Sequence, residues 1–127
     1  MLFVLEQRLL LAKAKIPSET DWYADYATRY TNDFAPAVNG RSDAWISIWN
    51  EPFMWDGSDD VTASVWLAEM VALIKVIRDA GTENILVIPC GLMGQDESAL
   101  LAKTSPEASL TAAQELLQYD ANLVFDV

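Results

Sequence analysis

The segment Trp45-Ile46-Ser47-Ile48-Trp49-Asn50-Glu51-Pro52 carries the strongest structural signal in this chain, because an apolar run leads directly into an Asn-Glu-Pro turn. Aromatic and β-branched residues favour a strand, and the Asn and Pro that follow favour a turn at its end. Parallel α/β proteins collect their reactive groups where such strands end. The segment therefore predicts that Glu51 lies at the C-terminal end of a strand.

Strand-like and helix-like segments alternate on both sides of this stretch. Ile85-Leu86-Val87-Ile88 is a continuous apolar run, which is typical of a parallel strand covered on both faces. The predicted strands are residues 44–49, 84–89 and 122–127, and the predicted helices are residues 18–34, 62–80 (with Gly81 as its C-terminal cap), 98–103 and 111–119. Because the strands recur about every 40 residues with a helix between each pair, they indicate βαβ units and a parallel sheet.

Some local predictions are less determined. Residues 2–5 fit a short buried strand, but together with residues 6–15 they also fit one helix. Pro36 predicts that a loop follows the first long helix. Trp45 and Trp66 are assigned to packing.

Two α/β architectures fit the alternation. A doubly wound nucleotide-binding sheet requires a glycine-rich turn after its first strand, whereas Gly91 and Gly94 are an isolated pair. A (β/α)8 barrel explains more, because Glu51, Asp96 and Asp126 stand at or just past predicted strand ends. The 127 residues are about half of the ~250 typical of that fold. We therefore expect one partial (β/α)8 TIM barrel domain over residues 1–127, incomplete at both ends.

Charge and hydropathy limit the partners. The 8 basic and 19 acidic side chains give a net charge of −11, which disfavours nucleic acid and anionic membranes. No apolar run reaches the roughly 18 residues of a membrane span. Glu6, Gln7 and Arg8 interrupt the apolar N-terminal segment, so no signal peptide is predicted there. We expect a soluble chain whose cellular location the sequence leaves open.

Residue types limit the chemistry. The chain has no His and one Cys, which excludes the usual neutral-pH base, an internal disulfide and a thiolate metal site. Chemistry must then rest on carboxylates, and no cofactor is predicted. Asp56, Asp59 and Asp60 form an acidic loop without the glutamate and turn glycine of a calcium-binding loop, so it is interpreted as a solvated turn and no metal site is predicted.

Ile48-Trp49-Asn50-Glu51-Pro52, with a Trp-containing strand before it and two βα units after it, resembles the fourth-strand motif of glycoside hydrolase family 5. This is the cellulase and mannanase family of the retaining clan of (β/α)8 glycosidases. The resemblance extends from Asp21 to Val127 and implies strands four to six, with strand three before them. It implies hydrolysis of β-linked polysaccharides or oligosaccharides, with Glu51 as general acid/base and Asn50 binding the sugar hydroxyl beside the reacting carbon. Members of this family are often secreted.

The family pattern also includes residues that this chain lacks. Family members carry a His after strand three, a His-Tyr pair after strand six and a nucleophilic Glu on strand seven, whereas this sequence has no His and its last predicted strand corresponds to strand six. A retaining mechanism requires two carboxyl groups about 5 to 5.5 Å apart, and Glu51 supplies only one of them. We expect these 127 residues alone to be inactive.

Each predicted site residue has a plainer interpretation. Glu51 also fits a solvated turn residue, and Asn50 fits an Asx-turn before Pro52. Trp49 and Trp55 fit either a platform on which a sugar ring lies or packing at the rim. The alternative for the whole chain is a non-catalytic truncated barrel that self-associates through its open sheet edges and at most binds carbohydrate.

Overall fold

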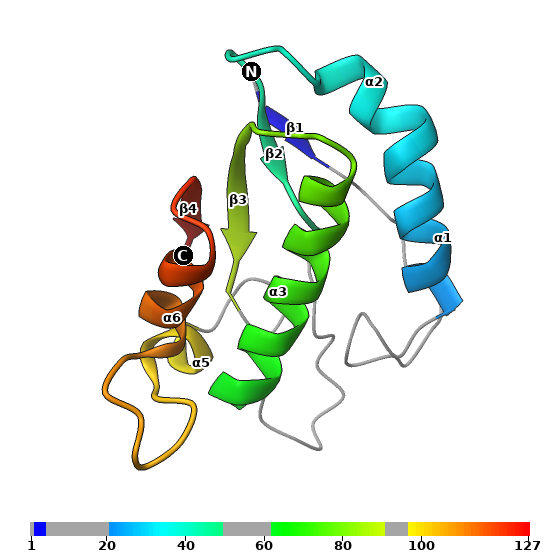
Figure 1. Ribbon diagram of the computed structural model, residues 1–127. Helices are drawn as coiled ribbons and strands as arrows, with labels where there is room; N and C mark the ends of the chain where they lie inside the picture. Colours follow the sequence, from blue (N-terminus) through cyan, green and yellow to red (C-terminus); the bar gives the residue numbers. More distant parts are fainter. Residues whose placement is uncertain (1, 5–20, 50–61, 91–96) are drawn as a thin grey trace.

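The computed structural model describes residues 2–4, 21–49, 62–90 and 97–127 (Figure 1). Its centre is one sheet of four parallel strands, and the order of the strands across the sheet follows their order in the sequence. The strands are β1 (Leu2–Val4), β2 (Trp45–Ser47), β3 (Ile85–Pro89) and β4 (Leu123–Asp126). Trp45 lies opposite Ile85, and Pro89 lies opposite Asp126. The parallel sheet is confirmed, and residues 2–4 are a strand rather than part of a helix.

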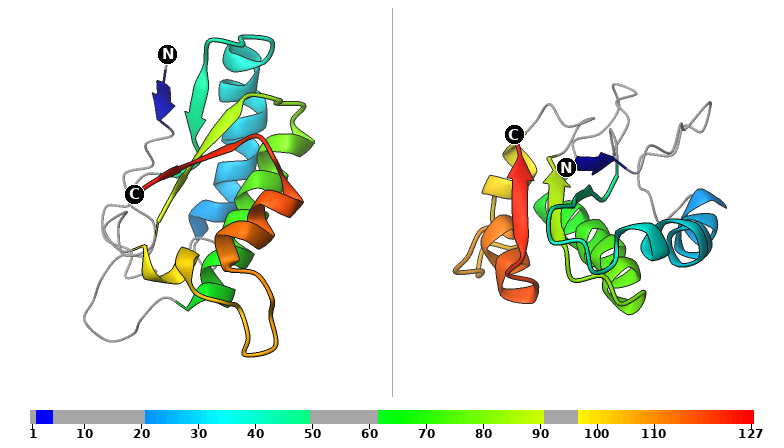
Figure 2. Two further views of the ribbon diagram at one scale, coloured as in Figure 1. Left: turned by 90° about the vertical axis from the view of Figure 1, so that its left-hand side faces the viewer. Right: turned by 90° about the horizontal axis from the view of Figure 1, so that it is seen from above.

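Helices cover one face of this sheet (Figure 2, right). They are α1 (Asp21–Arg29), the π-helix η2 (Tyr30–Phe34), α2 (Ala35–Val38), α3 (Ala63–Asp79), α5 (Ser98–Leu101) and α6 (Ala112–Tyr119). The first three follow one another without a break before β2, α3 connects β2 to β3, and the last two precede β4. Within the described ranges, no helix combines the length and the apolar composition needed to cross a bilayer.

Local signals in the sequence set the helix ends. The Thr62 hydroxyl caps α3 by accepting a hydrogen bond from the Val65 amide at 3.3 Å. Gly81 follows this helix with a φ of 81°, a conformation that glycine adopts at little steric cost. Thr111 and Gln114 form a reciprocal capping box at the start of α6.

The helical segment before β2 is longer than the sequence predicts. Pro36 lies in the first turn of α2 and not in a loop. Proline lacks the amide that the interior of an α-helix requires, and it lies here where the π-helix η2 passes into α2. The segment therefore continues through Val38, beyond the predicted end near residue 34.

The core lies between the helices and the sheet face that they cover. Its fully buried members from β2, β3, the residues after them and α3 are Ile46, Ile48, Leu86, Ile88, Met70, Leu73, Ile74 and Ile77. Trp66 is also fully buried, as predicted. Trp45 is not: it points away from the helices, opposite to Ile46, and is 43% exposed, so its assignment to packing is wrong for this structure.

The sheet face without helices is mostly apolar. We call it the helix-free face, and its described residues include Trp45, Ser47, Ile85, Val87, Val124 and Asp126. Val124 is 38% exposed there, and Ile85 and Val87 are half-buried.

Candidate functional site

β2 leads directly to the predicted site residues. It ends at Ser47, and the structure describes the chain through Trp49, the residue before Asn50 and Glu51. Because the strands are parallel, the chain leaves β2, β3 and β4 at the same edge of the sheet. Asn50, Glu51 and Trp55 lie outside the described residues, and their roles stay predictions.

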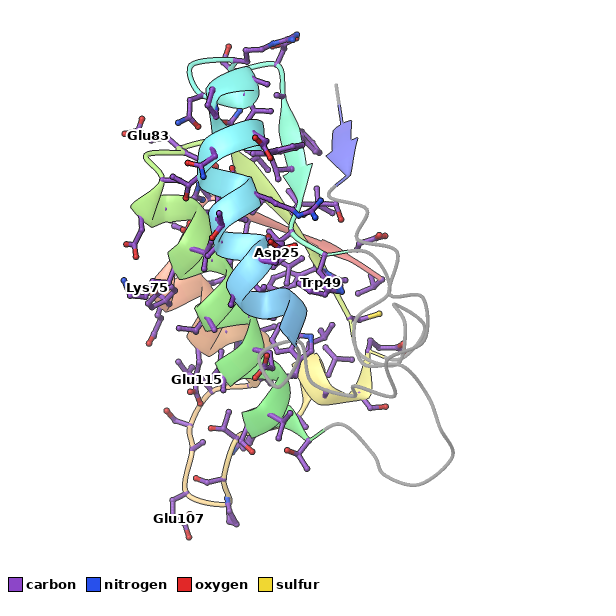
Figure 3. All side chains as sticks on the ribbon, turned by 90° about the vertical axis from the view of Figure 1, so that its right-hand side faces the viewer. Asp25, Trp49, Lys75, Glu83, Glu107 and Glu115 are labelled. Carbon is purple, nitrogen blue, oxygen red and sulfur yellow. The ribbon has the colours of Figure 1, made fainter. Side chains whose placement is uncertain are left out.

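Trp49 is buried rather than presented to a ligand. Its side chain is 1% exposed, and its ring stacks on that of Tyr26 from α1, with the ring centroids 5.2 Å apart and the planes inclined by 29° (Figure 3). No ring face is open for a sugar to lie on, so the geometry gives no support to a platform role for Trp49. Its indole Nε1 is buried and has no hydrogen-bond partner among the described residues.

Tyr26 holds the end of β2 from the helix layer. Its hydroxyl donates a buried hydrogen bond to the carbonyl oxygen of Ile48 at 2.6 Å. One turn further along, the Tyr30 hydroxyl donates instead to Thr82 Oγ1 at 2.9 Å, and burial raises the pKa of this hydroxyl above its usual value. Tyr26 was not among the residues that the sequence predicted at the site. The residue type could have indicated this role, because the hydroxyl of a buried tyrosine usually forms a hydrogen bond.

Trp66 holds the end of β3 in the same way. Its indole Nε1 donates a buried hydrogen bond to the carbonyl oxygen of Pro89 at 3.1 Å. Its ring also lies beside that of Phe125 in β4, with centroids 6.3 Å apart. Cys90, the next residue along the chain, is buried. Two neighbouring strands thus each end at a carbonyl bonded by an aromatic side chain from the helix layer.

In the part of the chain that the structure describes, few carboxylates lie near the C-terminal ends of the strands. Asp126 is the last residue of β4 and is exposed, which fits an ordinary strand-end acid. Asp96 lies outside the described residues. Across residues 2–4, 21–49, 62–90 and 97–127, no three side chains of His, Cys, Asp or Glu gather as a metal site.

A polar network lies at the opposite edge of the sheet, where the N-terminal ends of the strands lie. Arg78 of α3 pairs with Asp120 at 2.6 Å and donates to the carbonyl oxygens of Thr82 and Asn84, each at 2.9 Å. Burial works to raise the pKa of Asp120, but hydrogen bonds from Arg78 and from the Asn122 amide outweigh it, and the pKa lies below its usual value. This network joins α3 to the starts of β3 and β4.

A hollow of about 280 Å³ lies at this opposite edge. It is lined by Gly40, Arg41, Ser42, Gly81, Glu83 and Asn84. Arg41 pairs with Asp43 at 2.9 Å, and the hydrogen bond from Arg41 lowers the pKa of that carboxyl. In (β/α)8 barrels the N-terminal ends of the strands serve stability, and the reactive groups lie at the other ends. The hollow is therefore not the predicted site.

Comparison with known proteins bears on the fold. No protein-family model and no curated protein matches the sequence. A solved structure of XacCel5A, a family 5 cellulase, matches with a TM-score of 0.57 at 18% sequence identity. The fold is part of a (β/α)8 barrel.

The match confirms the predicted fold class and a family 5-like arrangement of strands and helices. It covers 98% of this chain and 37% of the XacCel5A chain, so the present sequence spans well under half of that barrel protein. At 18% identity the likeness shows the fold alone.

Proposed function

We propose that this chain is part of a retaining glycoside hydrolase that cleaves β-linked polysaccharides or oligosaccharides, with Glu51 as its general acid/base. One observation carries the proposal: parallel strand β2 leads through Trp49 into Asn50-Glu51-Pro52, in a fold shared with a family 5 cellulase. Catalytic residues of (β/α)8 barrels follow the C-terminal ends of strands. The substrate class and the residue roles rest on the resemblance of the motif.

The proposed reaction divides the work between two carboxyl groups. Glu51 protonates the leaving glycosidic oxygen while a carboxylate nucleophile attacks the anomeric carbon, and Glu51 then takes a proton from the water that hydrolyses the glycosyl-enzyme intermediate. Asn50 hydrogen-bonds the sugar hydroxyl beside the reacting carbon. We assign the nucleophile to a Glu on a strand that follows β4 in the complete barrel. Trp55 stays the candidate for stacking against a sugar ring.

Hydrolysis of aryl β-glycosides by the complete barrel tests the role of Glu51. Glu51→Gln should lower kcat/KM at least about 10²-fold for a substrate with a poor leaving group, because that group needs a proton. A dinitrophenyl glycoside should be cleaved with nearly unchanged kcat/KM, because its leaving group does not. Glu83→Gln, which lies at the opposite edge of the sheet (Figure 3), is the control and should change neither value. Equal losses on both substrates would contradict the acid role.

A second candidate is a non-catalytic partial barrel that self-associates and at most binds carbohydrate. The helix-free face favours it, because Trp45 and Val124 are large apolar side chains left exposed on a sheet. Titrating the isotope-labelled 127-residue chain with cellohexaose or mannohexaose separates sugar binding from hydrolysis. Asn50→Ala should weaken such binding, and Ser42→Ala, at the opposite edge, should not.

A further inference from the structure

One side chain, that of Tyr26, fixes the backbone just before the candidate acid/base. Its hydroxyl bonds the Ile48 carbonyl oxygen at 2.6 Å, and its ring stacks on Trp49 at 5.2 Å. On the strand side, the Ile48 amide donates to the Val87 carbonyl oxygen at 3.2 Å. Ile48 is therefore held through its amide by the sheet and through its carbonyl by the helix layer.

We propose that Tyr26 is a positioning residue for Glu51, acting through the backbone of Ile48 and Trp49; the proposal rests on the acid/base role proposed for Glu51. The backbone has two soft dihedral angles per residue, so few rotations separate the fixed Trp49 from the Glu51 side chain. A displacement of about 1 Å at a catalytic group lowers the rate about 10²-fold. The backbone that Tyr26 fixes thus ends two residues before the proposed acid/base in the sequence.

The neighbouring strand shows the same arrangement. Trp66 of α3 bonds the Pro89 carbonyl at the end of β3, as Tyr26 of α1 bonds the Ile48 carbonyl just past the end of β2. A helix-layer donor at two adjacent strand ends indicates that this edge is held more firmly than ordinary strand pairing would hold it.

Tyr30 offers a matched control. It lies one turn from Tyr26 on the same helical segment, is equally buried at 1% exposed, and also makes one buried hydroxyl hydrogen bond. That bond goes to Thr82, which precedes β3 at the opposite edge of the sheet from Ile48. Tyr26→Phe and Tyr30→Phe therefore remove the same group from equivalent surroundings, and only the first touches the backbone that leads to Glu51.

The test compares the two variants in the 127-residue chain. Both should lower the midpoint of urea unfolding by a similar amount. Only Tyr26→Phe should speed amide hydrogen exchange at Trp49 and Asn50, by about tenfold, as expected for one lost hydrogen bond. In the complete barrel, Tyr26→Phe should also lower kcat by up to about 10²-fold with KM little changed, because the backbone that leads to Glu51 is displaced, whereas Tyr30→Phe should leave kcat unchanged.

Equal exchange rates and equal kcat values in the two variants would overturn the proposal and leave Tyr26 a packing residue. Should Tyr26→Phe fail to fold, Trp49→Leu removes the ring contact and keeps the hydroxyl bond. Faster exchange at Asn50 in that variant supports the proposal, and unchanged exchange overturns it. Failure of the proposed function has a different signature: the complete barrel would not hydrolyse β-glycosides, while the exchange rates still decide the role of Tyr26.

Discussion

The Trp49 indole is an unusual buried side chain, because its ring is well packed and none of the described residues accepts a hydrogen bond from its N–H. The ring is 1% exposed against Tyr26, whereas Nε1 has no hydrogen-bond partner among the described residues. A buried donor without an acceptor costs about 1–3 kcal/mol. The stability that Trp49 provides is then the difference between its apolar packing and this penalty.

Trp49→Phe should therefore change the free energy of unfolding by less than about 1 kcal/mol, since the lost volume and the removed N–H have opposite effects. Trp66→Phe is the matched control, because Trp66 is equally buried but its N–H bonds the Pro89 carbonyl. That variant should lose about 2 kcal/mol more, since a buried carbonyl is left unpaired. Urea unfolding followed by far-ultraviolet circular dichroism measures both. A larger loss for Trp49→Phe would show that its N–H has an acceptor.

Asp120 makes stability depend on acid pH. Its pKa is lower in the folded chain than in the unfolded chain, so its contribution is complete above the unfolded value of about 3.9 and is lost as pH falls through the lower folded value. Asp120→Asn should cost about 2 kcal/mol at pH 7, because charged hydrogen bonds from Arg78 are lost. Near pH 2 the variant and the unmodified chain should converge.

Asp79→Asn provides the comparison for this pH effect. Asp79 pairs with Lys75 on the surface of α3, where both side chains are more than half exposed, so its loss should change stability little at any pH. Urea unfolding at pH 7, 5 and 3 distinguishes the two variants. A difference between Asp120→Asn and the unmodified chain that stays constant from pH 7 to pH 3 would rule out titration of Asp120 as its source.

An asparagine directly precedes each of the strands β3 and β4, and its side chain donates hydrogen bonds to the segment before the neighbouring strand. Asn84 directly precedes β3, and its side-chain amide donates to the carbonyl oxygens of Arg41 and Ala44, just before β2, at 2.7 and 2.9 Å. Asn122 directly precedes β4 and donates to the Glu83 carbonyl oxygen, just before β3, at 2.6 Å. Each asparagine ties the start of its strand to the start of the strand before it, which fixes the register of the pair.

Asn84→Ala should destabilise the chain more than Asn122→Ala, although the residue change is the same. Asn84 is 9% exposed and makes two such bonds, so its loss leaves two carbonyls short of a partner and should cost about 2–3 kcal/mol. Asn122 makes one exposed bond, worth about 1 kcal/mol. Urea unfolding of both variants is the measurement. The reverse order would mean that the Asn84 bonds do not hold β3 against β2.

Elements with strong local signals were predictable from the sequence. α3 has helical periodicity from Thr62 to Ala80, and Gly81 follows its end as predicted. β3 follows from its continuous apolar run. α2 was missed because Pro36 disfavours the interior of a helix but not its first turn.

Contacts between distant elements were not predictable in the same way. The stacking of Tyr26 on Trp49 joins residues 23 positions apart and depends on how α1 lies against the sheet. The apolar character of Trp45 and Val124 suggests burial, yet both are exposed. The sequence of a strand shows whether both of its faces are apolar. It does not show which other elements cover each face. The motif Asn50-Glu51-Pro52 predicted where in the sequence the candidate site lies, but it did not predict how the side chains are arranged.

Among the residues that the structure describes, helices cover only one face of the sheet. Helices pack on one face, whereas the helix-free face presents Trp45 and Val124, and β1 and β4 each pair with a strand on one side only (Figure 2). In a closed (β/α)8 barrel that face lines the packed interior and no strand edge is free. The described part of the chain therefore has both a mostly apolar face and two open sheet edges to bury.

We expect the isolated chain to self-associate through this face, with Trp45 as its main contributor. Trp45→Ser should weaken association by at least about tenfold, because a tryptophan at the centre of an interface carries a large share of the binding energy. Tyr119→Ser is the control: Tyr119 is 51% exposed, more than Trp45, but lies on α6 in the helix layer, so its loss should leave association unchanged.

The net charge of −11 opposes contact between copies, so association should strengthen as salt rises from about 0.05 to 0.5 M. Sedimentation equilibrium over a range of concentrations measures all three effects. A chain that stays monomeric at high salt, or equal weakening by the two variants, would show that the helix-free face does not bind a second copy.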